Sequence, residues 1–388
     1  MSIRIAKKED KKSIYSIMSY CFNIGNNYIE NNCKDEEYPY EQFLVSEKDG
    51  IVNNVINIVP FKMMFNGKFY NMGGIAGVSS LPEDRGNRSV AALLTKSMEY
   101  MKERNMIFSS LAPFAMSFYR KYGYEWGVTW QLINIPINDL KGFKSAKKYV
   151  SLNKNNNDII EKVRDEFIKN MNGPVFHDEK ILNDRWNGFY NSFTHCYASY
   201  DESDKINAIA FYKIEGRELK VEEFYYLNEE GKENILHFFF THRSQVDSVE
   251  LITTTKDNTR NILPNCRIKY WQWPFVMIRI VVVKDAIEAM KIDNNFERFT
   301  IKVNDEQAPW NNKVFSIDSK DLKIVVLEES TNNYDFEINI QRLSQLVFGF
   351  IDASEAIETN QIKVLNQNKV SELKKLFIKK ETMMWQKF

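Results

Sequence analysis

The sequence is poor in the residues that bind metals or form disulfides. Among its 388 residues it has only four cysteines and four histidines. The cysteines are scattered, and no C-x-x-C pair occurs among Cys21, Cys33, Cys196 and Cys266. A zinc site is therefore not expected, and buried thiols in a reducing cytoplasm are the favoured interpretation. We predict a cytoplasmic protein that binds no metal.

An excess of charge and a long apolar run are also absent. The 52 basic residues equal the 52 acidic ones, which disfavours binding of nucleic acid through bulk charge. The most hydrophobic stretch, residues 275–283, is shorter than the roughly 20 residues that span a bilayer, and Arg279 interrupts it. The N-terminus has no apolar core, so no secretory signal is expected. We predict neither a nucleic-acid partner nor a membrane partner.

The length of the chain suits two or three domains. Apolar residues make up 44% of the sequence and aromatic residues 14%, enough for sizeable cores. A polar stretch rich in Asn and Lys, residues 147–158, is interpreted as a linker or mobile loop. We predict three α+β units, at residues 1–146, 147–282 and 283–388.

Turn chemistry and periodicity predict the elements of the first unit. Asp49-Gly50 and Asn66-Gly67 separate apolar runs and favour hairpins. The apolar spacing indicates helices at 13–22 and 89–104. Strands are predicted at 3–5, 43–46, 51–65, 68–80, 106–111 and 125–135, and a short helix at 113–122. The junction of strand, loop and helix between Ser80 and Ser89 predicts an anion-binding site, because the first amides of a helix are unpaired.

The same signals divide the other two units. In the second unit they predict strands at 206–213, 219–226 and 249–254 and a helix at 232–242. In the third they predict strands at 299–303, 313–317, 322–327 and 336–340, and helices at 286–290, 341–348 and 369–377. The strand-to-helix junction of the second unit, residues 227–232, has two acids where phosphates would sit. Since like charges repel, we expect no second anion site there.

Two stretches of the first unit resemble a known family. Residues 73–90 read Gly-Gly-Ile-Ala-Gly-Val-Ser-Ser-Leu-Pro-Glu-Asp-Arg-Gly-Asn-Arg-Ser-Val. This stretch resembles the coenzyme A loop of the GNAT superfamily of N-acetyltransferases, and more narrowly that of the enhanced intracellular survival (Eis) family. Residues 118–124, Phe-Tyr-Arg-Lys-Tyr-Gly-Tyr, resemble a second stretch of that family. The resemblance implies tandem GNAT-fold domains, a sterol-carrier-protein-like C-terminal domain, and a homo-oligomer, a hexamer in the family.

The resemblance implies that acetyl-CoA is the co-substrate and that its pyrophosphate binds at the loop. The family pattern is roughly Arg-x-x-Gly-x-(Ala/Val/Leu); Arg85 and Val90 match it, but Arg88 stands at the glycine position. Gly86 can supply the missing freedom, and Arg88 can either reach a phosphate or block the site. The backbone groups of Val78 and Ser80 are expected to pair with the pantetheine arm. The predicted cofactor-binding residues are Val78, Ser80, Arg85, Gly86, Arg88, Ser89 and Val90.

Acetyl transfer needs a proton donor for the leaving thiolate and an acceptor for the proton of the amine. By resemblance the donor is Tyr119, although 19 tyrosines occur and most of them pack in cores. The resemblance also implies that the C-terminal carboxylate, on Phe388, enters the active site of the first domain as general base. The large apolar residues Met383, Met384 and Trp385 disfavour a frayed terminus.

A cationic amine favours an acidic pocket. Glu30, Glu36 and Glu37 lie in the long loop after the first helix and are the candidate acceptor-binding residues. A solvated acidic loop is at least as good an interpretation of these residues.

The leading hypothesis is an Eis-like N-acetyltransferase acting on a primary amine of a polyamine, an aminoglycoside-like molecule or a lysine side chain. One alternative is a non-catalytic ligand- or lipid-binding protein whose coenzyme loop is degenerate. Another is an acyltransferase that uses a longer acyl chain.

Overall fold

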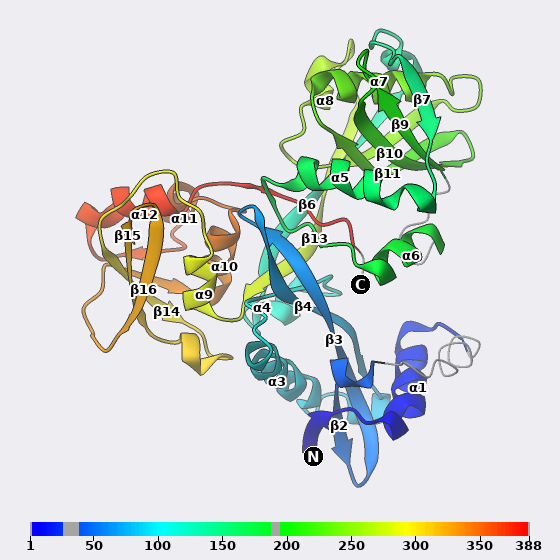
Figure 1. Cartoon of the computed structure of the whole chain (residues 1–388). Coiled ribbons are helices and arrows are strands. Elements are labelled where there is room, and N and C mark those ends of the chain that lie inside the picture. The colour runs from blue at the N-terminus through cyan, green and yellow to red at the C-terminus, as the bar shows by residue number, and fades with distance from the viewer. Residues whose placement is uncertain (1, 26–38, 188–194, 387–388) are drawn as a thin grey trace.

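The computed structural model describes residues 2–25, 39–187 and 195–386 (Figure 1). Within them lie a 12-stranded sheet, a five-stranded sheet and a short two-stranded pairing. The mixture of helices and strands in all three units confirms the α+β prediction. No helix of the described residues is long and apolar enough to cross a membrane.

The first unit follows its turn chemistry closely. Its elements are β1 (Ser2–Ile5), α1 (Lys11–Phe22), β2 (Phe43–Lys48), β3 (Ile51–Phe65), β4 (Lys68–Ser80), α3 (Ser89–Glu103), β5 (Phe108–Leu111), α4 (Met116–Arg120) and β6 (Glu125–Pro136). Both hairpin turns have the left-handed backbone that Asn, Asp and Gly tolerate, with φ of 54° at Asp49, 80° at Gly50, 49° at Asn66 and 82° at Gly67. The predicted hairpins are therefore confirmed.

The second unit contains several elements that the sequence did not predict. Its elements are β7 (Lys148–Ser151), α5 (Asn157–Ile168), β8 (Met171–Asn172), α6 (Glu179–Asn187), β9 (His195–Tyr200), β10 (Ile206–Glu215), β11 (Glu218–Tyr226), α7 (Glu229–Phe240), β12 (Ser248–Thr253), α8 (Thr259–Ile262) and β13 (Lys269–Ile280). The interpretation of residues 147–158 as a linker is wrong, because β7 pairs with β9 at the edge of the large sheet. Leu152 just beyond β7 is buried in the core, which gives this polar stretch an apolar anchor.

The large sheet joins the first two units by exchanging their last strands. Its order is β1-β2-β3-β4-β5-β13-β6-β12-β11-β10-β9-β7. β13, from the second unit, pairs with β5 of the first, whereas β6, from the first unit, pairs with β12 of the second. β13 and β6 also pair with each other along most of their length. The two units are therefore one continuous sheet, while the boundaries at residues 146 and 282 stay predictions.

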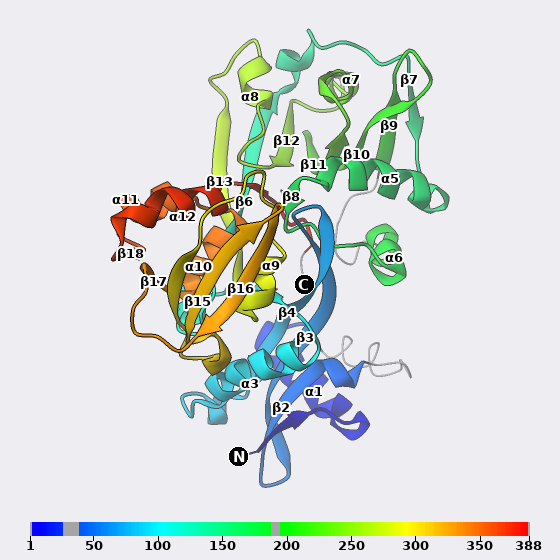
Figure 2. The same ribbon diagram turned by 60° about the vertical axis from the view of Figure 1, so that its left-hand side comes forward.

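The third unit packs its own sheet and helices against this joint. Its elements are α9 (Val283–Glu288), β14 (Phe299–Asn304), β15 (Val314–Lys320), β16 (Lys323–Glu329), β17 (Phe336–Asn339), α10 (Ile340–Phe348), α11 (Ala353–Glu358), β18 (Lys363–Val364) and α12 (Val370–Leu376). Its strand order is β16-β15-β14-β17-β18. One buried cluster contains Phe108 of the first unit, Phe211 of the second and Phe336 of the third. The views in Figures 1 and 2 both place α10 beside β6 and β13, which agrees with this shared core.

The last residues leave the third unit and cross to the other two. β19 (Glu381–Thr382) pairs in parallel with β8. Figure 1 shows this red segment running past β6 and β13 and ending near α6. Met383, Met384 and Trp385 are buried, so the described part of the tail is packed rather than frayed.

Candidate active site

Strands β4 and β5 separate after a short parallel pairing. They pair only between Met72–Gly74 and Phe108–Ser110. Opposite β3 the register of β4 shifts by one residue near Gly77, a β-bulge in which Gly77 has a φ of 57°. A Cβ at Gly77 would lie 2.9 Å from Cε of Met18, so glycine also allows α1 to approach. Within the described residues, β4 continues to Ser80 with no strand on its β5 side.

Helix α3 follows this strand after the loop of residues 81–88 and has an open N-terminus. No side chain among the described residues caps it, and its first paired amide is that of Ala92, which donates to the carbonyl of Arg88 at 3.0 Å. The amides of Ser89 and Val90 therefore belong to the first turn, where helical partners are lacking. Such an end attracts anions through its N–H groups and its dipole. The position matches the anion site that the sequence predicts.

Arg88, the departure from the family pattern, has the backbone that a glycine would have. Its φ is 61° and its ψ 10°, in the left-handed region. That conformation costs a non-glycine residue roughly 1–2 kcal/mol. Arg88 thus has a backbone conformation that glycine adopts without this cost. Arg88 is exposed at the open helix end, so it can reach an anion there but is not buried against it.

A buried aspartate, Asp84, holds the loop between β4 and α3 in place. Asp84 accepts hydrogen bonds from the side-chain amides of Asn54 and, at 3.2 Å, of Asn87. Burial alone would raise the pKa of Asp84, but the hydrogen bonds, led by that from Asn54, hold it below its ordinary value. Arg85 folds back, its Nε donating to the carbonyl of Ser80 at 3.2 Å. The loop is therefore preorganised, with Gly86 at a φ of 87°.

Tyr119 lies on α4, the next element after β5. Its side chain is 3% exposed and packs edge-on against Phe114, Phe118 and Tyr124, with ring centroids 5.3, 5.1 and 6.2 Å away. It shares a buried cluster with Ile75 of β4. Burial raises the pKa of Tyr119 well above its ordinary value, and nearby Tyr124 adds to the shift. The phenol is thus protonated at neutral pH, as a general acid must be.

Tyr124, the last residue of the 118–124 stretch, has a packing role. Tyr124 is fully buried, and its hydroxyl lies 2.7 Å from Oγ of Ser109, which in turn donates to the carbonyl of Gly73. Burial raises the pKa of Tyr124 to about 12. These bonds fasten α4 to the start of the β4–β5 separation.

The C-terminal tail passes beside that separation. Nε1 of Trp130 donates to the carbonyl of Met384 at 2.8 Å, and Oγ of Ser110 lies 3.8 Å from the sulfur of Met384. Ser110 is the last β5 residue paired with β4. The proposed base, Phe388, lies outside the described residues, and so do Glu30, Glu36 and Glu37 of the acidic loop.

A buried polar cluster anchors the tail, and no pattern in the sequence pointed to it. The side-chain amide of Gln386 lies 2.5 Å from Nε2 of His177. Nδ1 of His177 lies 2.7 Å from the guanidinium of Arg185, which also pairs with Glu161 at 2.7 Å and with Glu223 at 3.3 Å. Burial lowers the pKa of His177 to about 3, and the charges of Arg164 and Arg185 act in the same direction. A neutral histidine therefore fixes the chain two residues before its end.

Family models match each of the three units. A GNAT acetyltransferase domain matches residues 2–127, a second one matches residues 175–280, and a sterol carrier protein domain matches residues 283–385. The chain belongs to the GNAT acetyltransferase superfamily. Its two acetyltransferase domains followed by a sterol carrier protein domain are the Eis-like arrangement. It is thus an acyl-CoA-dependent acetyltransferase by family.

Solved structures share the fold of this GNAT protein over the full chain. A GCN5-related N-acetyltransferase from Anabaena variabilis has a TM-score of 0.88 at 22% identity, with 100% of both chains covered. Eis1 from Mycobacterium abscessus has a TM-score of 0.81 at 14% identity, also with 100% of both covered. A probable N-acyltransferase from Enterococcus faecalis has a TM-score of 0.87 at 21% identity, covering 100% of this chain and 99% of that one. A search of curated proteins finds no match.

The second GNAT domain closes the helix end that the first leaves open. The side chain of Asn228 caps α7 by accepting a hydrogen bond from the amide of Gly231 at 2.8 Å. Glu229 and Glu230 occupy the first turn. A Cβ at Gly231 would lie 2.3 Å from the carbonyl oxygen of Asn207, so the backbone there already packs tightly. No group of His, Cys, Asp and Glu that could hold a metal occurs in either domain or elsewhere in the described chain.

Proposed function

We propose that this GNAT protein moves acetyl from acetyl-CoA to a primary amine of a polyamine, an aminoglycoside-like molecule or a lysine side chain. Family membership supports acetyl transfer in general. The proposal adds that acetyl-CoA is the donor and that a primary amine is the acceptor. The observation that supports it most is the open N-terminus of α3 beside the free edge of β4, with Tyr119 in the same buried cluster.

The residues of the loop suit a pyrophosphate. The amides of Ser89 and Val90 and the helix dipole favour its negative charge. Arg88 adds an exposed guanidinium at this end, and a guanidinium binds phosphate in a bidentate fashion. Arg85 would add a second one on leaving the carbonyl of Ser80. We assign the edge of β4 that has no strand partner, from Val78 to Ser80, to the amide groups of the pantetheine arm, which would displace Arg85 from the carbonyl of Ser80. Backbone N–H groups at that edge would polarise the thioester carbonyl.

Two groups of the chain would move the protons. Tyr119 would donate the proton of its hydroxyl to the departing thiolate, since its raised pKa keeps that proton in place. The α-carboxylate of Phe388 would accept the proton of the attacking amine. An unshifted α-carboxyl has a pKa of about 3.3–3.7 and is a weak base, so the site must raise its pKa by burial. The packed tail up to Gln386 supports delivery of the carboxylate to the first domain.

The remaining parts of the hypothesis stay predictions. The acidic residues Glu30, Glu36 and Glu37 would line the acceptor side, and a homo-oligomer would form as in the family. The rival function, a ligand-binding protein with a degenerate loop, requires that Arg88 prevents coenzyme binding. The left-handed backbone of Arg88, which suits the glycine of the family pattern, instead favours a loop that accepts a pyrophosphate.

A blocked C-terminus tests the proposal. Release of coenzyme A thiol would be measured with acetyl-CoA and a panel of amines, for the native chain and for a chain extended by four glycines after Phe388. We expect the extension to lower kcat at least about tenfold with little change in the acetyl-CoA KM, because it displaces the base and leaves the loop intact. An equal extension at the N-terminus is the control. Full activity of the C-terminally extended chain would remove the carboxylate from the mechanism, and no turnover with any amine would favour the rival function.

A further inference from the structure

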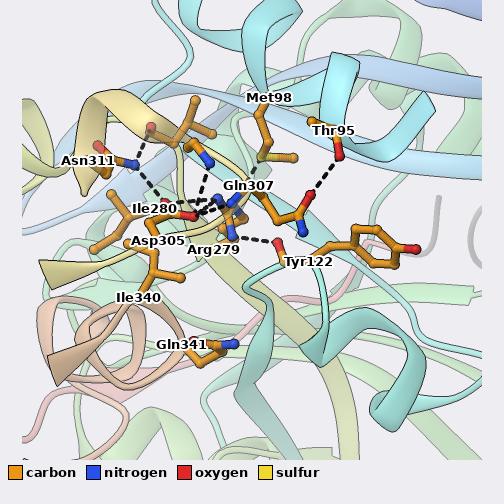
Figure 3. Close-up of polar contacts among 12 residues, drawn as sticks. Thr95, Met98, Tyr122, Arg279, Ile280, Asp305, Gln307, Asn311, Ile340 and Gln341 are labelled. Atoms are coloured by element: carbon orange, nitrogen blue, oxygen red, sulfur yellow. Dashed lines mark hydrogen bonds and ion pairs between the residues drawn. The ribbon is translucent and has the colours of Figure 1, made fainter. Parts of the chain in front are cut away.

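The single charge in the most apolar stretch of the sequence lies at the junction of all three units. Arg279 is on β13, opposite Ser109 of β5, and its side chain is 0% exposed. Figure 3 shows its guanidinium at the centre of the contacts between the units. A buried cation is costly unless its donors find acceptors. The hydrogen-bond partners of Arg279 therefore show which segments this residue holds together at the junction.

One side of Arg279 binds the third unit. Nη2 donates to both carboxylate oxygens of Asp305, at 2.8 and 2.9 Å. Asp305 also accepts hydrogen bonds from the amide of Ala308 at 3.1 Å and from the side chain of Asn311 at 3.0 Å. Asn311 donates in turn to the carbonyl of Val281, in the segment that connects β13 to α9. The orientation of Arg279 is thus set by the third unit.

The other side of Arg279 binds the chain just after α4. Nη1 donates to the carbonyl oxygen of Tyr122. Gln341, also from the third unit, donates to the carbonyl of Arg120 at 2.8 Å. The carbonyl of Arg120 is at the end of α4 and also accepts a hydrogen bond from the amide of Gly123 at 3.1 Å, and the carbonyl of Tyr122 lies in the turn that follows. Arg279 and Gln341 therefore hold the end of the helix that carries Tyr119 from outside the first domain.

Gly123 makes room for this contact. Its φ is 83°, and a Cβ there would lie 1.3 Å from Nη1 of Arg279. The glycine of the 118–124 stretch is therefore required twice, by its left-handed backbone and by the guanidinium that crosses it. Directly after it, the amide of Tyr124 donates to the carbonyl of Tyr119 at 3.3 Å. The turn that Arg279 grips is the turn that closes on Tyr119.

We propose that Arg279, oriented by Asp305, is a positioning residue that holds α4 so that the Tyr119 hydroxyl meets the acyl donor. The inference rests on the proposed role of Tyr119 as general acid. It gives the sterol carrier protein domain a part in catalysis, because this domain supplies both Asp305 and Gln341. A shift of about 1 Å in a catalytic group can lower a rate on the order of a hundredfold.

Substitution by lysine tests the geometry while keeping the charge. Lysine cannot donate to Asp305 and to the carbonyl of Tyr122 from one planar group. We expect Arg279→Lys to lower kcat about tenfold, within the range for displaced catalytic groups, and to change the acetyl-CoA KM less than about twofold. Gln341→Ala removes the second donor without a buried charge, and we expect it to lower kcat about threefold on the same basis. Thermal unfolding checks that each variant is folded at the assay temperature.

A matched aspartate in the same domain separates positioning from stability. Asp335 also accepts a hydrogen bond from a backbone amide, that of Thr300 at 2.8 Å, but the described side chains that bond its carboxylate, Thr300 and Asn366, both lie in the third unit. Asp305→Asn should lower kcat, whereas Asp335→Asn should lower only the unfolding temperature. If both lower kcat equally, or if Arg279→Lys leaves kcat unchanged, the positioning role is wrong.

A double variant distinguishes failure of this inference from failure of the proposed function. If Arg279 acts through Tyr119, adding Arg279→Lys to Tyr119→Phe should cause no further loss of kcat. Multiplicative losses would overturn the positioning role. Full activity of Tyr119→Phe alone would instead overturn the assignment of Tyr119 as general acid.

Discussion

The two acetyltransferase domains share a fold but differ at one helix end. In the first domain no described side chain caps α3, which follows β4 after a loop, and the end of β4 has no strand on its β5 side in the described chain. In the second, Asn228 caps α7 and two glutamates follow it. A helix N-terminus offers the same amides and dipole in both cases. Whether a helix N-terminus binds an anion therefore depends on a few neighbouring residues. They either leave the first amides without partners or accept hydrogen bonds from them.

Side-chain chemistry after the central strands separates the domains as well. β5 leads into α4, with the buried Tyr119 against the start of the strand separation. The second domain also has a buried tyrosine with a raised pKa, Tyr212, but its hydroxyl lies 3.3 Å from Nε2 of His242 and serves a local contact. A raised pKa alone thus does not mark a catalytic tyrosine.

Removing one hydroxyl from each domain should give the largest contrast. We expect Tyr119→Phe to lower kcat about a hundredfold, since loss of a general acid costs about 10²–10⁴. The acetyl-CoA KM should stay within about twofold, because the ring still packs and the loop is untouched. Tyr212→Phe is the control and should leave kcat unchanged. Equal losses in steady-state assays of thiol release would show that the tyrosine effect is structural.

Reversing charge at each helix end should give an intermediate contrast. Arg88→Glu places an acid at the open end of α3, and we expect the Kd for acetyl-CoA to rise at least about tenfold, or about 1.4 kcal/mol. Glu229→Arg reverses the charge at the capped end of α7 and should leave the Kd within about twofold. Equilibrium dialysis with labelled acetyl-CoA measures both. A larger effect of Glu229→Arg would place the coenzyme in the second domain.

Restoring the glycine should give the smallest effect. Arg88→Gly removes a left-handed strain of roughly 1–2 kcal/mol but adds about 0.5–1 kcal/mol of backbone entropy loss on folding. We expect the unfolding temperature to rise by about 1 °C, which calorimetry can resolve. Asparagine also tolerates this backbone conformation. The unfolding temperature of Arg88→Asn should therefore lie between those of the native protein and of Arg88→Gly. A fall of several degrees would mean that the Arg88 side chain stabilises the loop more than its backbone strains it.

Turn residues and apolar spacing within short stretches made the hairpins and helices α1 and α3 of the first unit predictable. Asp49-Gly50 and Asn66-Gly67 fix their turns without help from distant residues. β7 could not be predicted in this way, because its polar residues become a strand only by pairing with the edge strand β9. The exchange of β6 and β13 is equally non-local, and no residue of either strand signals it.

The candidate site divides along the same line. The loop from Val78 to Val90 and the position of Tyr119 follow from short stretches of sequence. The tail anchor at His177 and the junction at Arg279 join residues 209 and 26 positions apart. Their partners become visible only once the three units are packed together. Arg279 did stand out in the sequence as a charge in an apolar run. That pattern suggested a buried charge but did not identify its partners.

The central claim is that the coenzyme binds at the N-terminus of α3 and not at that of α7. Calorimetric titration of acetyl-CoA into the untagged protein tests this claim most directly. We expect one site per chain, weakened by Arg88→Glu and unchanged by Asn228→Ala, whose opened α7 still carries two glutamates. Two sites per chain, or binding that Arg88→Glu leaves untouched, would contradict the account.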